Sequence, residues 1–513
     1  MQGEPLAPDD LAAMTGEAIR FEDSELATQV SLPHSQALPI VLSLLCTLFL
    51  TALDQTIVAT ALPTIGAQFH DVSNLSWVIT AYLLSSTAVA PAYGALADIY
   101  GRRAMIVTAT VLFLVGSVLC ALAPNLLTLI LARGLQGVGG GGILPLVQTL
   151  IADMVTPRDR GRYQGYISMV WVTAGIGGPV LGGVFAQHLH WSMIFWINLP
   201  IGFGALILLL PRLRKIPDRH RRRKLDWMGG LLLMVSAVVF LLALTWGGHR
   251  FAWLSPAILG MIGSAVVLMA AFVVHARRTE EPFLPLSLIS GPVVPYSMVA
   301  GGCAMGAMIA MTVLLPIYYE AIYRLSASEA GLALIPLVAV SVLGAWSAGQ
   351  FMAVTGRYKW AAVGGASLAT GCLLLIAFWV TPPLWLLLSL LAVLAMGIGT
   401  CFPISVVSIQ NAVPRSQVGT ATGAMNFFRS LMSSFAVALF TAILLAVIGQ
   451  DIPIGEGAGG GGSNIPLDGM INGFRFVFLA AAFLMVIAAA LFALMEERPL
   501  AGGVPSPAAG MVE

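Results

Sequence analysis

Charged residues are scarce in this chain: Lys, Arg, Asp and Glu make up 10% of its 513 residues, whereas hydrophobic residues make up 58%. Soluble domains carry roughly 25% charged residues, so the composition excludes an ordinary soluble protein. A mean hydropathy of +0.90 indicates a chain that crosses a membrane many times. The net charge of +1 predicts no nucleic-acid partner, because nucleic-acid-binding surfaces are strongly basic.

Cysteines and catalytic motifs are scarce as well. The sequence holds no zinc-ligand cluster, phosphate-binding loop or nucleophile elbow, so we expect no enzymatic activity, no metal and no cofactor. The five cysteines lie in apolar segments without the spacing of a disulfide framework or a metal site. We expect them to be packing residues: Cys46, Cys120, Cys303, Cys372 and Cys401.

The chain also lacks a positively charged start. Its first 37 residues contain seven acidic residues and a single base, Arg20. A secretory signal peptide begins with basic residues, so this segment does not fit one. We predict a disordered acidic tail over residues 1–37, followed by an uncleaved membrane helix.

Long apolar runs dominate the rest of the sequence. A spanning helix needs about 20 apolar residues, and fourteen runs reach that length. We therefore expect an all-α polytopic membrane protein with 14 transmembrane helices. Their expected bounds are 38–62, 75–97, 104–123, 126–151, 164–187, 193–211, 228–247, 255–276, 293–319, 329–353, 360–380, 383–410, 419–448 and 471–495.

Basic residues in the loops predict the orientation. One set of alternate loops carries 18 Lys and Arg residues, and the opposite set carries two, Arg250 and Arg324. Because Lys and Arg are retained on the cytoplasmic side, both termini are expected to be cytoplasmic. The densest basic segment, 211–224, has two open interpretations: it fixes the topology between two bundles, or it binds anionic lipid headgroups.

Asp54 is the residue that bears most directly on function. It lies in the run from Leu38 to Pro63, which otherwise carries no charge. An acid inside a membrane is costly unless it is protonated, paired or facing water, and such acids mark ion pathways by default. The alternative is an acid near a helix end that reaches interfacial water.

An internal repeat suggests two halves of like orientation. The segment GALADIYGRR, which begins at Gly94, is echoed by GQFMAVTGRYK, which begins at Gly349; Ala353 stands where the first copy has Asp98. Parallel repeats of this kind characterise transporters that rock two bundles about a central site. The expected organisation is an acidic tail (1–37), a six-helix bundle (38–211), a basic loop (212–227), two inserted helices (228–276), a loop (277–292), a second six-helix bundle (293–495) and a cytoplasmic tail (496–513).

Five segments together give the chain a recognisable resemblance. It resembles the major facilitator superfamily, and within it the 14-helix drug:proton antiporters, over roughly residues 38–495. The first motif departs from the usual pattern at Ala59, where Asn is more common. The segments are LDQTIVATALP (Leu53 to Pro63), GALADIYGRR (Gly94 to Arg103), LARGLQGVGGG (Leu131 to Gly141), GIGGPVLGG (Gly175 to Gly183) and HWSMIFWINLPIG (His190 to Gly202).

The resemblance implies three functional groups of residues. Asp54 and Arg133 are expected to form the proton-coupling site, with the plainer alternative that Arg133 only binds backbone carbonyls. A conformational latch is expected from Gly94, Asp98, Gly101, Arg102 and Arg103, unless these charges are simply solvated. A close helix seam typical of exporters is expected from Gly175, Gly178, Pro179, Gly182 and Gly183, unless the glycines serve ordinary packing.

Two further residues are candidates for the substrate cavity. Gln136 lies one turn from Arg133, and Glu320 ends the ninth apolar run, where it either attracts cationic substrates or sits solvated or paired with Arg324. Arg429 is expected at the cytoplasmic face or at the mouth of the cavity.

We therefore predict a proton-coupled antiporter that exports lipophilic, in part cationic, compounds. The expected location is the bacterial plasma membrane, and the expected partners are small lipophilic substrates, protons and the bilayer. A periplasmic adaptor is left open, because the glycine-rich segment 457–462 does not decide it. The alternatives are a dedicated exporter of one metabolite or siderophore-like product, and a non-transporting membrane sensor.

Overall fold

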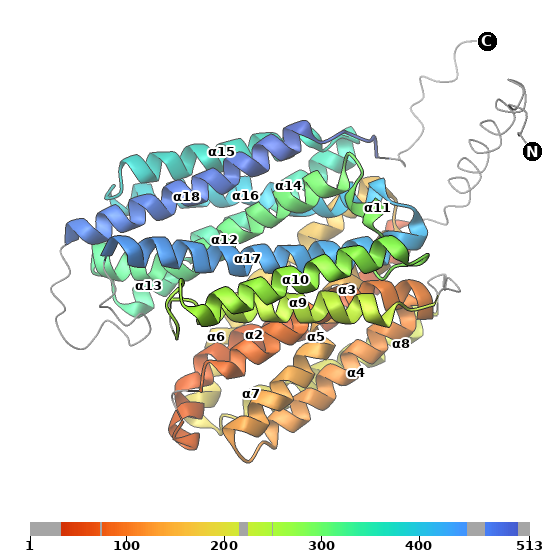
Figure 1. Ribbon diagram of the computed structural model, residues 1–513, viewed down its shortest axis with the longest axis horizontal. Helices are drawn as coiled ribbons and strands as arrows, with labels where there is room; N and C mark the ends of the chain where they lie inside the picture. Colours follow the sequence, from red (N-terminus) through yellow and green to blue (C-terminus); the bar gives the residue numbers. More distant parts are fainter. Residues whose placement is uncertain (1–31, 72–73, 215–223, 249, 449–466, 501–513) are drawn as a thin grey trace, which may run out of the picture.

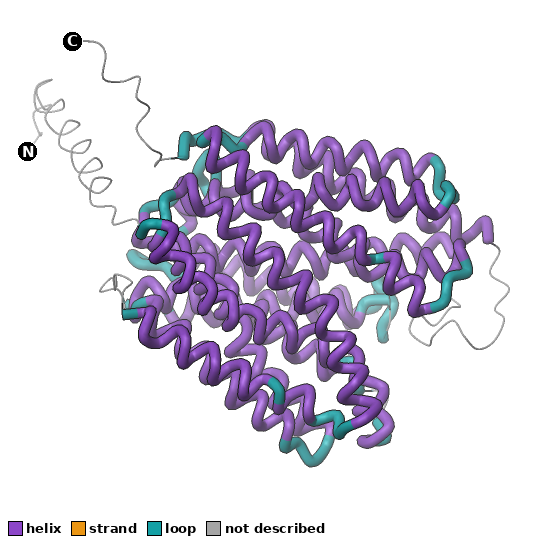
Figure 2. The backbone as a smooth tube through the Cα atoms, turned by 180° about the vertical axis from the view of Figure 1, so that it is seen from behind, coloured by secondary structure: helices purple, strands orange, loops and turns teal. Residues whose placement is uncertain are grey.

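The computed structural model describes residues 32–71, 74–214, 224–248, 250–448 and 467–500, which are almost entirely helical (Figure 2). No strand occurs among these residues. Helices are expected here because every backbone polar group inside a membrane must find its partner within the segment. The expectations for residues 1–31 and 457–462, and for most of the basic loop, concern residues outside the described ranges.

Fourteen helical segments of the described chain are long and apolar enough to cross a membrane, which confirms the predicted number. They are α2 (His34–Phe69), α3 (Trp77–Tyr100), α4 (Arg102–Ala121), α5 (Leu126–Met154), α6 (Pro157–His188), α7 (Met193–Trp196) with α8 (Asn198–Leu213), α9 (Trp227–Trp246), α10 (Pro256–Arg278), α12 (Val294–Tyr323), α13 (Ala327–Ala333) with α14 (Ile335–Thr355), α15 (Lys359–Phe378), α16 (Leu384–Ala412), α17 (Val418–Ile448) and α18 (Leu467–Leu494).

Two spans differ from their expected form. Helix α2 continues through Pro63 to Phe69 instead of ending at residue 62, because a proline inside a membrane helix removes only one backbone hydrogen bond. The sixth span is interrupted at Ile197, between the short helix α7 and helix α8. Asn198 thereby becomes the first residue of α8 and is fully buried.

The spans pack as two groups with a helix pair beside them. Helices α2 to α8 contact one another and form the first bundle, while α12 and α14 to α18 form the second. The inserted helices α9 and α10 pack against each other, and α9 contacts both α3 and α17 (Figure 1). The inserted pair therefore lies over one of the two junctions between the bundles.

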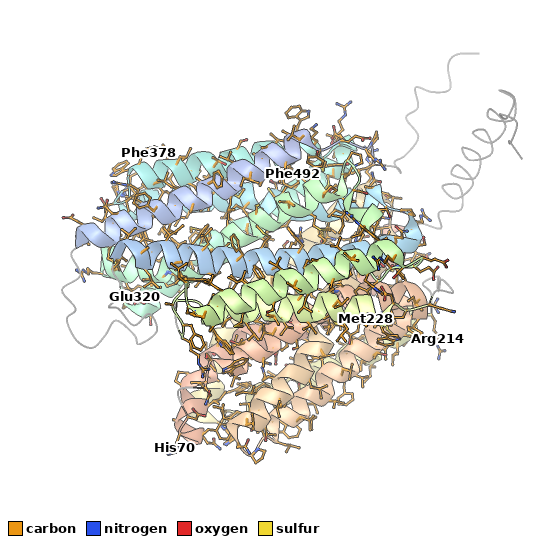
Figure 3. The ribbon with its side chains drawn as sticks, in the orientation of Figure 1. His70, Arg214, Met228, Glu320, Phe378 and Phe492 are labelled. Atoms are coloured by element: carbon orange, nitrogen blue, oxygen red, sulfur yellow. The ribbon has the colours of Figure 1, made fainter. Side chains whose placement is uncertain are left out.

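The bundles are joined near one end of the molecule. We call this the basic end, because the loops rich in Lys and Arg lie there; Arg214 marks it in Figure 3, whereas His70 and Glu320 lie at the opposite end. Figure 1 shows the helices of the first bundle sloping away from the second toward that opposite end. The hydrogen bonds that the described residues make between the bundles all lie in the half nearer the basic end.

The two repeated glycines permit close backbone approaches between the bundles. A Cβ atom on Gly94 of α3 would lie 2.4 Å from the carbonyl oxygen of Gly419 on α17. A Cβ atom on Gly349 of α14 would likewise lie 2.4 Å from the carbonyl oxygen of Gly161 on α6. Each repeat thus supplies one glycine contact to the opposite bundle, and we call these contacts the α3–α17 seam and the α6–α14 seam.

Candidate functional site

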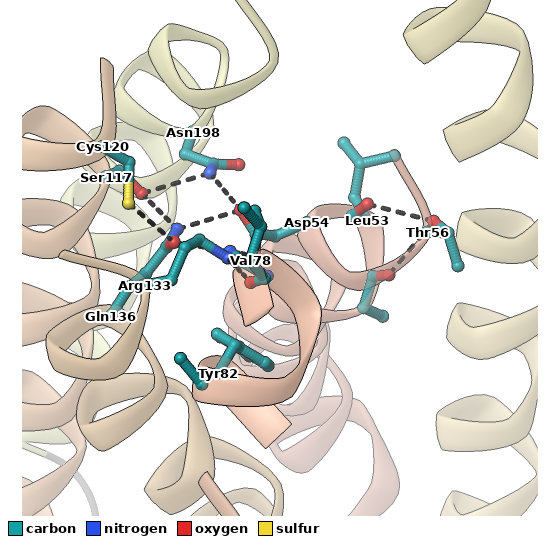
Figure 4. A network of polar contacts seen from close by, with 12 residues as sticks. Leu53, Asp54, Thr56, Val78, Tyr82, Ser117, Cys120, Arg133, Gln136 and Asn198 are labelled. Carbon is teal, nitrogen blue, oxygen red and sulfur yellow. Dashed lines mark hydrogen bonds and ion pairs between the residues drawn. The ribbon is translucent and has the colours of Figure 1, made fainter. Parts of the chain in front are cut away.

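Asp54 lies at the centre of a buried polar network in the first bundle (Figure 4). Its Oδ2 accepts a hydrogen bond from Arg133 Nη1 at 2.6 Å, and its Oδ1 accepts from Gln136 Nε2 and Asn198 Nδ2, both at 2.9 Å. Asp54, Gln136 and Asn198 are fully buried, and Arg133 is 1% exposed. The network thus brings together α2, α5 and α8 around one carboxylate.

Arg133 uses its remaining groups on neighbours of the same bundle. Its Nε donates to the carbonyl oxygen of Val78 at 3.1 Å. Its guanidinium carbon lies 4.4 Å above the ring of Tyr82 and 5.7 Å from that of Phe195, within the range of cation–π contacts. Both interpretations of Arg133 therefore have a geometric basis, since it contacts the acid and a carbonyl.

Close packing of α4 against α5 supports this network. A Cβ atom on Gly116 would lie 2.5 Å from the Cα of Gln136, so the glycine permits the approach. Ser117, the next residue, accepts hydrogen bonds from Gln136 Nε2 at 2.7 Å and from Asn198 Nδ2 at 3.1 Å. The hydroxyl thereby orients both amides toward Asp54. Three hydrogen-bond donors, one of them a guanidinium, thus converge on the Asp54 carboxylate.

Asp98 and Arg102 form a second charged cluster, at the basic end. Asp98 Oδ2 accepts from the backbone N–H of Thr420 at 2.8 Å and from its hydroxyl at 2.9 Å, near the start of α17. Arg102 pairs with Asp98 at 3.3 Å and with Asp153 of α5, and it donates to the carbonyl oxygen of Arg415 at 3.2 Å. This cluster, which we call the latch, crosses the α3–α17 seam.

The other residues predicted for the latch have different positions. Gly101 has φ of 89°, a left-handed conformation that favours glycine, and it links α3 to α4. Gly94 forms the seam itself. Among the described residues, no hydrogen bond or ion pair joins Arg103 to this cluster.

The second seam has a different polar contact, because Ala353 replaces the acid. Arg158 of α6 donates from Nε and Nη2 to the carbonyl oxygens of Ala353 and Val354, in the last turn of α14. A cation at a helix C-terminus and an acid at a helix N-terminus are both favourable. The α3–α17 seam therefore has the acid Asp98 near the start of α17, whereas the α6–α14 seam has the base Arg158 at the end of α14.

The glycine-rich stretch of α6 divides into two faces. Gly178 and Gly182 face α2: a Cβ on either would lie 2.0 Å from the hydroxyl of Thr56 or Thr60, respectively. By contrast, a Cβ on Gly175 or Gly183 would meet nothing within 4 Å. Pro179 is exposed. In this conformation the close seam is one between two helices of the same bundle.

The remaining predicted residues lie apart. Gln136 belongs to the Asp54 network rather than to an accessible surface of this conformation. Glu320 is partly exposed near the end of α12, and no hydrogen bond or ion pair joins it to Arg324 among the described residues. Arg429 is 7% exposed and donates hydrogen bonds to Phe402 and Ser405 of α16 in the second bundle.

Sequence reasoning missed several polar members of these clusters. Asn198 stood within a motif that carried the family resemblance, and Ser117 was a polar residue in an apolar run. Their contacts depend on how α4, α5 and α8 meet, which no local pattern contains. Asp153 and Thr420 are separated by 267 positions in the sequence and meet Arg102 and Asp98 only through the fold.

Comparison with known proteins assigns the fold to a family. The sequence matches the profile of the Major Facilitator Superfamily over residues 44–437. Multidrug transporter protein MdtP of Bacillus subtilis (strain 168) is 31% identical over 413 residues, which cover 80% of this chain and 76% of MdtP. MFS-type efflux pump LUC4 of a Fusarium species is 35% identical over 412 residues, which cover 78% of this chain and 72% of LUC4.

A solved structure, that of the human organic anion transporter MFSD10 (TETRAN), aligns with a TM-score of 0.61 over 89% of this chain and 100% of that one. Its sequence identity of 14% makes this a likeness of fold. The profile match and the relatives, together with the fourteen membrane-spanning helices, show that the chain belongs to the major facilitator superfamily of membrane transporters.

Proposed function

We propose that this protein is a proton-driven exporter of lipophilic, in part cationic, compounds, and that Asp54 carries the exchanged proton. The observation behind the proposal is the 2.6 Å ion pair between Asp54 and Arg133, with side chains 0% and 1% exposed inside membrane spans. Intramembrane acids mark ion and proton pathways by default. The names of the relatives, a multidrug transporter and an efflux pump, support export as its direction.

The network offers a simple physical basis for exchange. In this conformation three donors are directed at the carboxylate of Asp54. A proton that reaches Asp54 cancels this charge and weakens the hold on Arg133, so that α5 gains freedom to move against α2. A ligand shifts the equilibrium between two states of a protein only if it binds them with different affinities. If the substrate binds only one protonation state of Asp54, its transport therefore becomes coupled to that of the proton.

The site lies entirely within the first bundle, so rigid rocking of the bundles does not break it. Protonation must act through a local movement of α5 or α8. Ile197, between the short helix α7 and helix α8 and next to Asn198, is a suitable place for such a movement. From there the change would reach the seams at the basic end.

We also propose a plasma-membrane location with the basic end in the cytoplasm. The support is the distribution of 18 basic residues on one set of loops against two on the other. With this orientation the latch closes the cytoplasmic side, and the conformation described here is outward-facing. Substrate would then leave between the diverging halves of the two bundles.

A proton-flux assay in inside-out vesicles tests the function. Vesicles with an acid interior and an internal pH dye would receive a panel of lipophilic cations and neutral drugs. We expect substrates to trigger proton release with the natural chain and none with Asp54→Asn. Substrate-driven, proton-dependent export by Asp54→Asn would contradict the assignment of Asp54.

Glu320→Gln provides a second comparison in the same vesicles. It removes an acid that lies outside the buried network, so proton exchange with neutral drugs should be unchanged. If Glu320 attracts cations, the KM for cationic drugs alone should rise. Absence of both flux and binding would favour a dedicated metabolite exporter, whereas binding without any proton response would favour a sensor.

A further inference from the structure

Arg429 is a second buried arginine, and its surroundings differ from those of Arg133. It is 7% exposed on α17 and donates from Nη2 to the carbonyl oxygen of Phe402, at 2.9 Å, and to the hydroxyl of Ser405. Its Nε is buried and has no hydrogen-bond partner among the described residues. Arg133, by contrast, is neutralised by Asp54.

The second bundle supplies no acid to pair with Arg429. The sequence contains no Asp or Glu from residue 282 to 319 or from residue 330 to 450. Glu320 follows the first of these stretches, and it lies at the end of α12 that is remote from the basic end. None of the ion pairs found among the described residues includes Arg429.

Arg429 lies close to the junction of the two bundles. Three residues before it, Asn426 donates to Gln148 Oε1 of α5 at 2.7 Å, across that junction. Arg429 is the eleventh residue after Val418, the first residue of α17, which places it about 16 Å into the helix at 1.5 Å per residue. Arg429 therefore lies well inside the span of α17, one turn beyond a polar contact between the bundles.

A glycine lets helix α12 pack closely against the residues around the unpaired donor. A Cβ atom on Gly301 of α12 would lie 2.7 Å from Ser405 Oγ and 3.6 Å from Arg429 Nε. The hydroxyls of Ser297 and Ser408 are 2.6 Å apart nearby, and Ser297 Oγ donates to the Ser405 carbonyl oxygen at 3.4 Å. Small and hydroxyl-bearing side chains thus surround the cation instead of a carboxylate.

An arginine cannot lose its proton in a protein, so this charge is permanent. A buried charge without an opposite charge is unfavourable, and carbonyl and hydroxyl dipoles offset only part of that cost. The planar guanidinium fork matches a carboxylate, which can accept two parallel hydrogen bonds from it. An anionic group brought between the bundles would therefore gain the interaction that the second bundle itself does not provide.

We propose that Arg429 recognises a carboxylate on transported molecules, so that the substrates include lipophilic acids and zwitterions. This inference rests on the proposed export function and extends its substrate class. Because Nε is enclosed in this conformation, binding requires a small shift of the Ser405 hydroxyl or of the guanidinium. The anion site and Asp54 lie in different bundles, so one substrate can contact the second bundle while protonation acts on the first.

A matched pair of ligands tests the proposal on the purified full-length protein in lipid nanodiscs. The pair is 1-pyrenebutyrate and its uncharged amide, titrated by quenching of tryptophan fluorescence and corrected with empty nanodiscs. We expect Arg429→Gln to raise the Kd of the acid by about tenfold or more and to leave that of the amide within about twofold. Arg475→Gln, which removes an exposed arginine of α18 that donates to Asn472 Oδ1, should change neither value.

Arg429→Lys keeps the charge and loses the fork, so it should weaken binding of the acid by less than Arg429→Gln and leave the amide unchanged. Arg429→Lys also serves as the test if Arg429→Gln does not fold. Equal effects on both ligands, an unchanged Kd for the acid, or no binding of the acid to the natural protein would overturn the proposal. The titration needs no proton gradient, so Arg429-dependent binding without proton exchange would contradict the proposed export function alone.

Discussion

At the scale of single residues, Asp54 and Arg133 illustrate how a buried ion pair constrains its own mutants. Each side chain is acceptable inside the membrane only because the other is present. Replacing one partner leaves an uncompensated buried charge, which costs more than removing both. Stability measurements can therefore detect the pair without any assumption about transport.

Arg133→Ala should destabilise the protein by about 3–5 kcal/mol, because it leaves the carboxylate of Asp54 buried and unpaired. The double variant Asp54→Asn with Arg133→Ala should be more stable than Arg133→Ala alone. The measurement is denaturant unfolding of the four proteins of this double-mutant cycle. Additive effects of the two substitutions would mean that the pair does not interact energetically.

The sequence predicted the Asp54–Arg133 pair because both residues are charged, whereas the uncharged residues that bond Asp54 carry no such signal. Asp54 is the single acid of its apolar run and Arg133 the single base of the fourth, so charge alone draws attention to both. Asn198 and Ser117 are uncharged and common in membrane helices. Their importance comes from three helices meeting around one carboxylate, a tertiary arrangement that composition and periodicity do not contain.

At the scale of helices, the glycine stretch of α6 provides an internal comparison. Gly178 faces α2, where a Cβ would lie 2.0 Å from Thr56 Oγ1, whereas a Cβ on Gly175 would meet nothing within 4 Å. We expect Gly178→Val to abolish transport while the protein still inserts, because the added bulk separates α6 from α2. Gly175→Val should leave the melting temperature unchanged.

Transport assays and thermal unfolding of both variants check this expectation. Unchanged transport by Gly178→Val would contradict the role of the α2–α6 seam. The sequence grouped all five residues of the stretch as one seam, since their spacing alone does not say which glycines face a neighbouring helix. The structure divides them, because α6 presents only one side to α2.

Asp226 connects the two inserted helices at the basic end. It precedes α9 and accepts hydrogen bonds from the backbone N–H of Gly229 at 2.9 Å and of Phe283 at 3.0 Å, and it pairs with His275 of α10 at 2.8 Å. Burial alone would raise the pKa of Asp226, but these hydrogen bonds outweigh it and hold the pKa below its usual range.

Asp226→Ala should destabilise the protein by about 1–2 kcal/mol at neutral pH, through loss of the helix cap. The sign of the pH dependence follows from the lowered pKa. The contribution of Asp226 is complete above its unfolded pKa of about 4 and is lost as the pH falls through the folded value. Unfolding of wild type and variant at several pH values checks this, and a difference that grows toward acid pH would contradict it.

At the scale of the whole molecule, the sequence predicted the number of spans better than their arrangement. Apolar length alone identifies fourteen helices, because a bilayer sets a minimum length. The repeat at Gly94 and Gly349 also indicated two halves. The position of α9 against α3 and α17 could not be predicted, since neither inserted helix carries a motif that specifies its neighbours.

The repeat has a consequence for conformational change that neither half shows alone. Gly94 and Gly349 occupy equivalent positions, and each holds its seam closed by contact with a backbone carbonyl 2.4 Å from where a Cβ would be. Bulk at either glycine should therefore open the same end of the molecule. Gly364, where a Cβ would meet nothing within 4 Å, is the matched control in the second bundle.

We expect Gly94→Val and Gly349→Val to shift the protein from the conformation closed at the basic end toward one open there. Spin labels on exposed residues would report it: Tyr100 and Trp360 at the basic end, and Leu122 and Phe378 at the opposite end. Distances across the basic end should lengthen and those across the opposite end shorten in both variants, as two bundles that rock about a central site require. A change of the spin-label distances in only one glycine variant, or an equal change in Gly364→Val, would contradict this prediction. The two seams would then not contribute equally to closing the basic end.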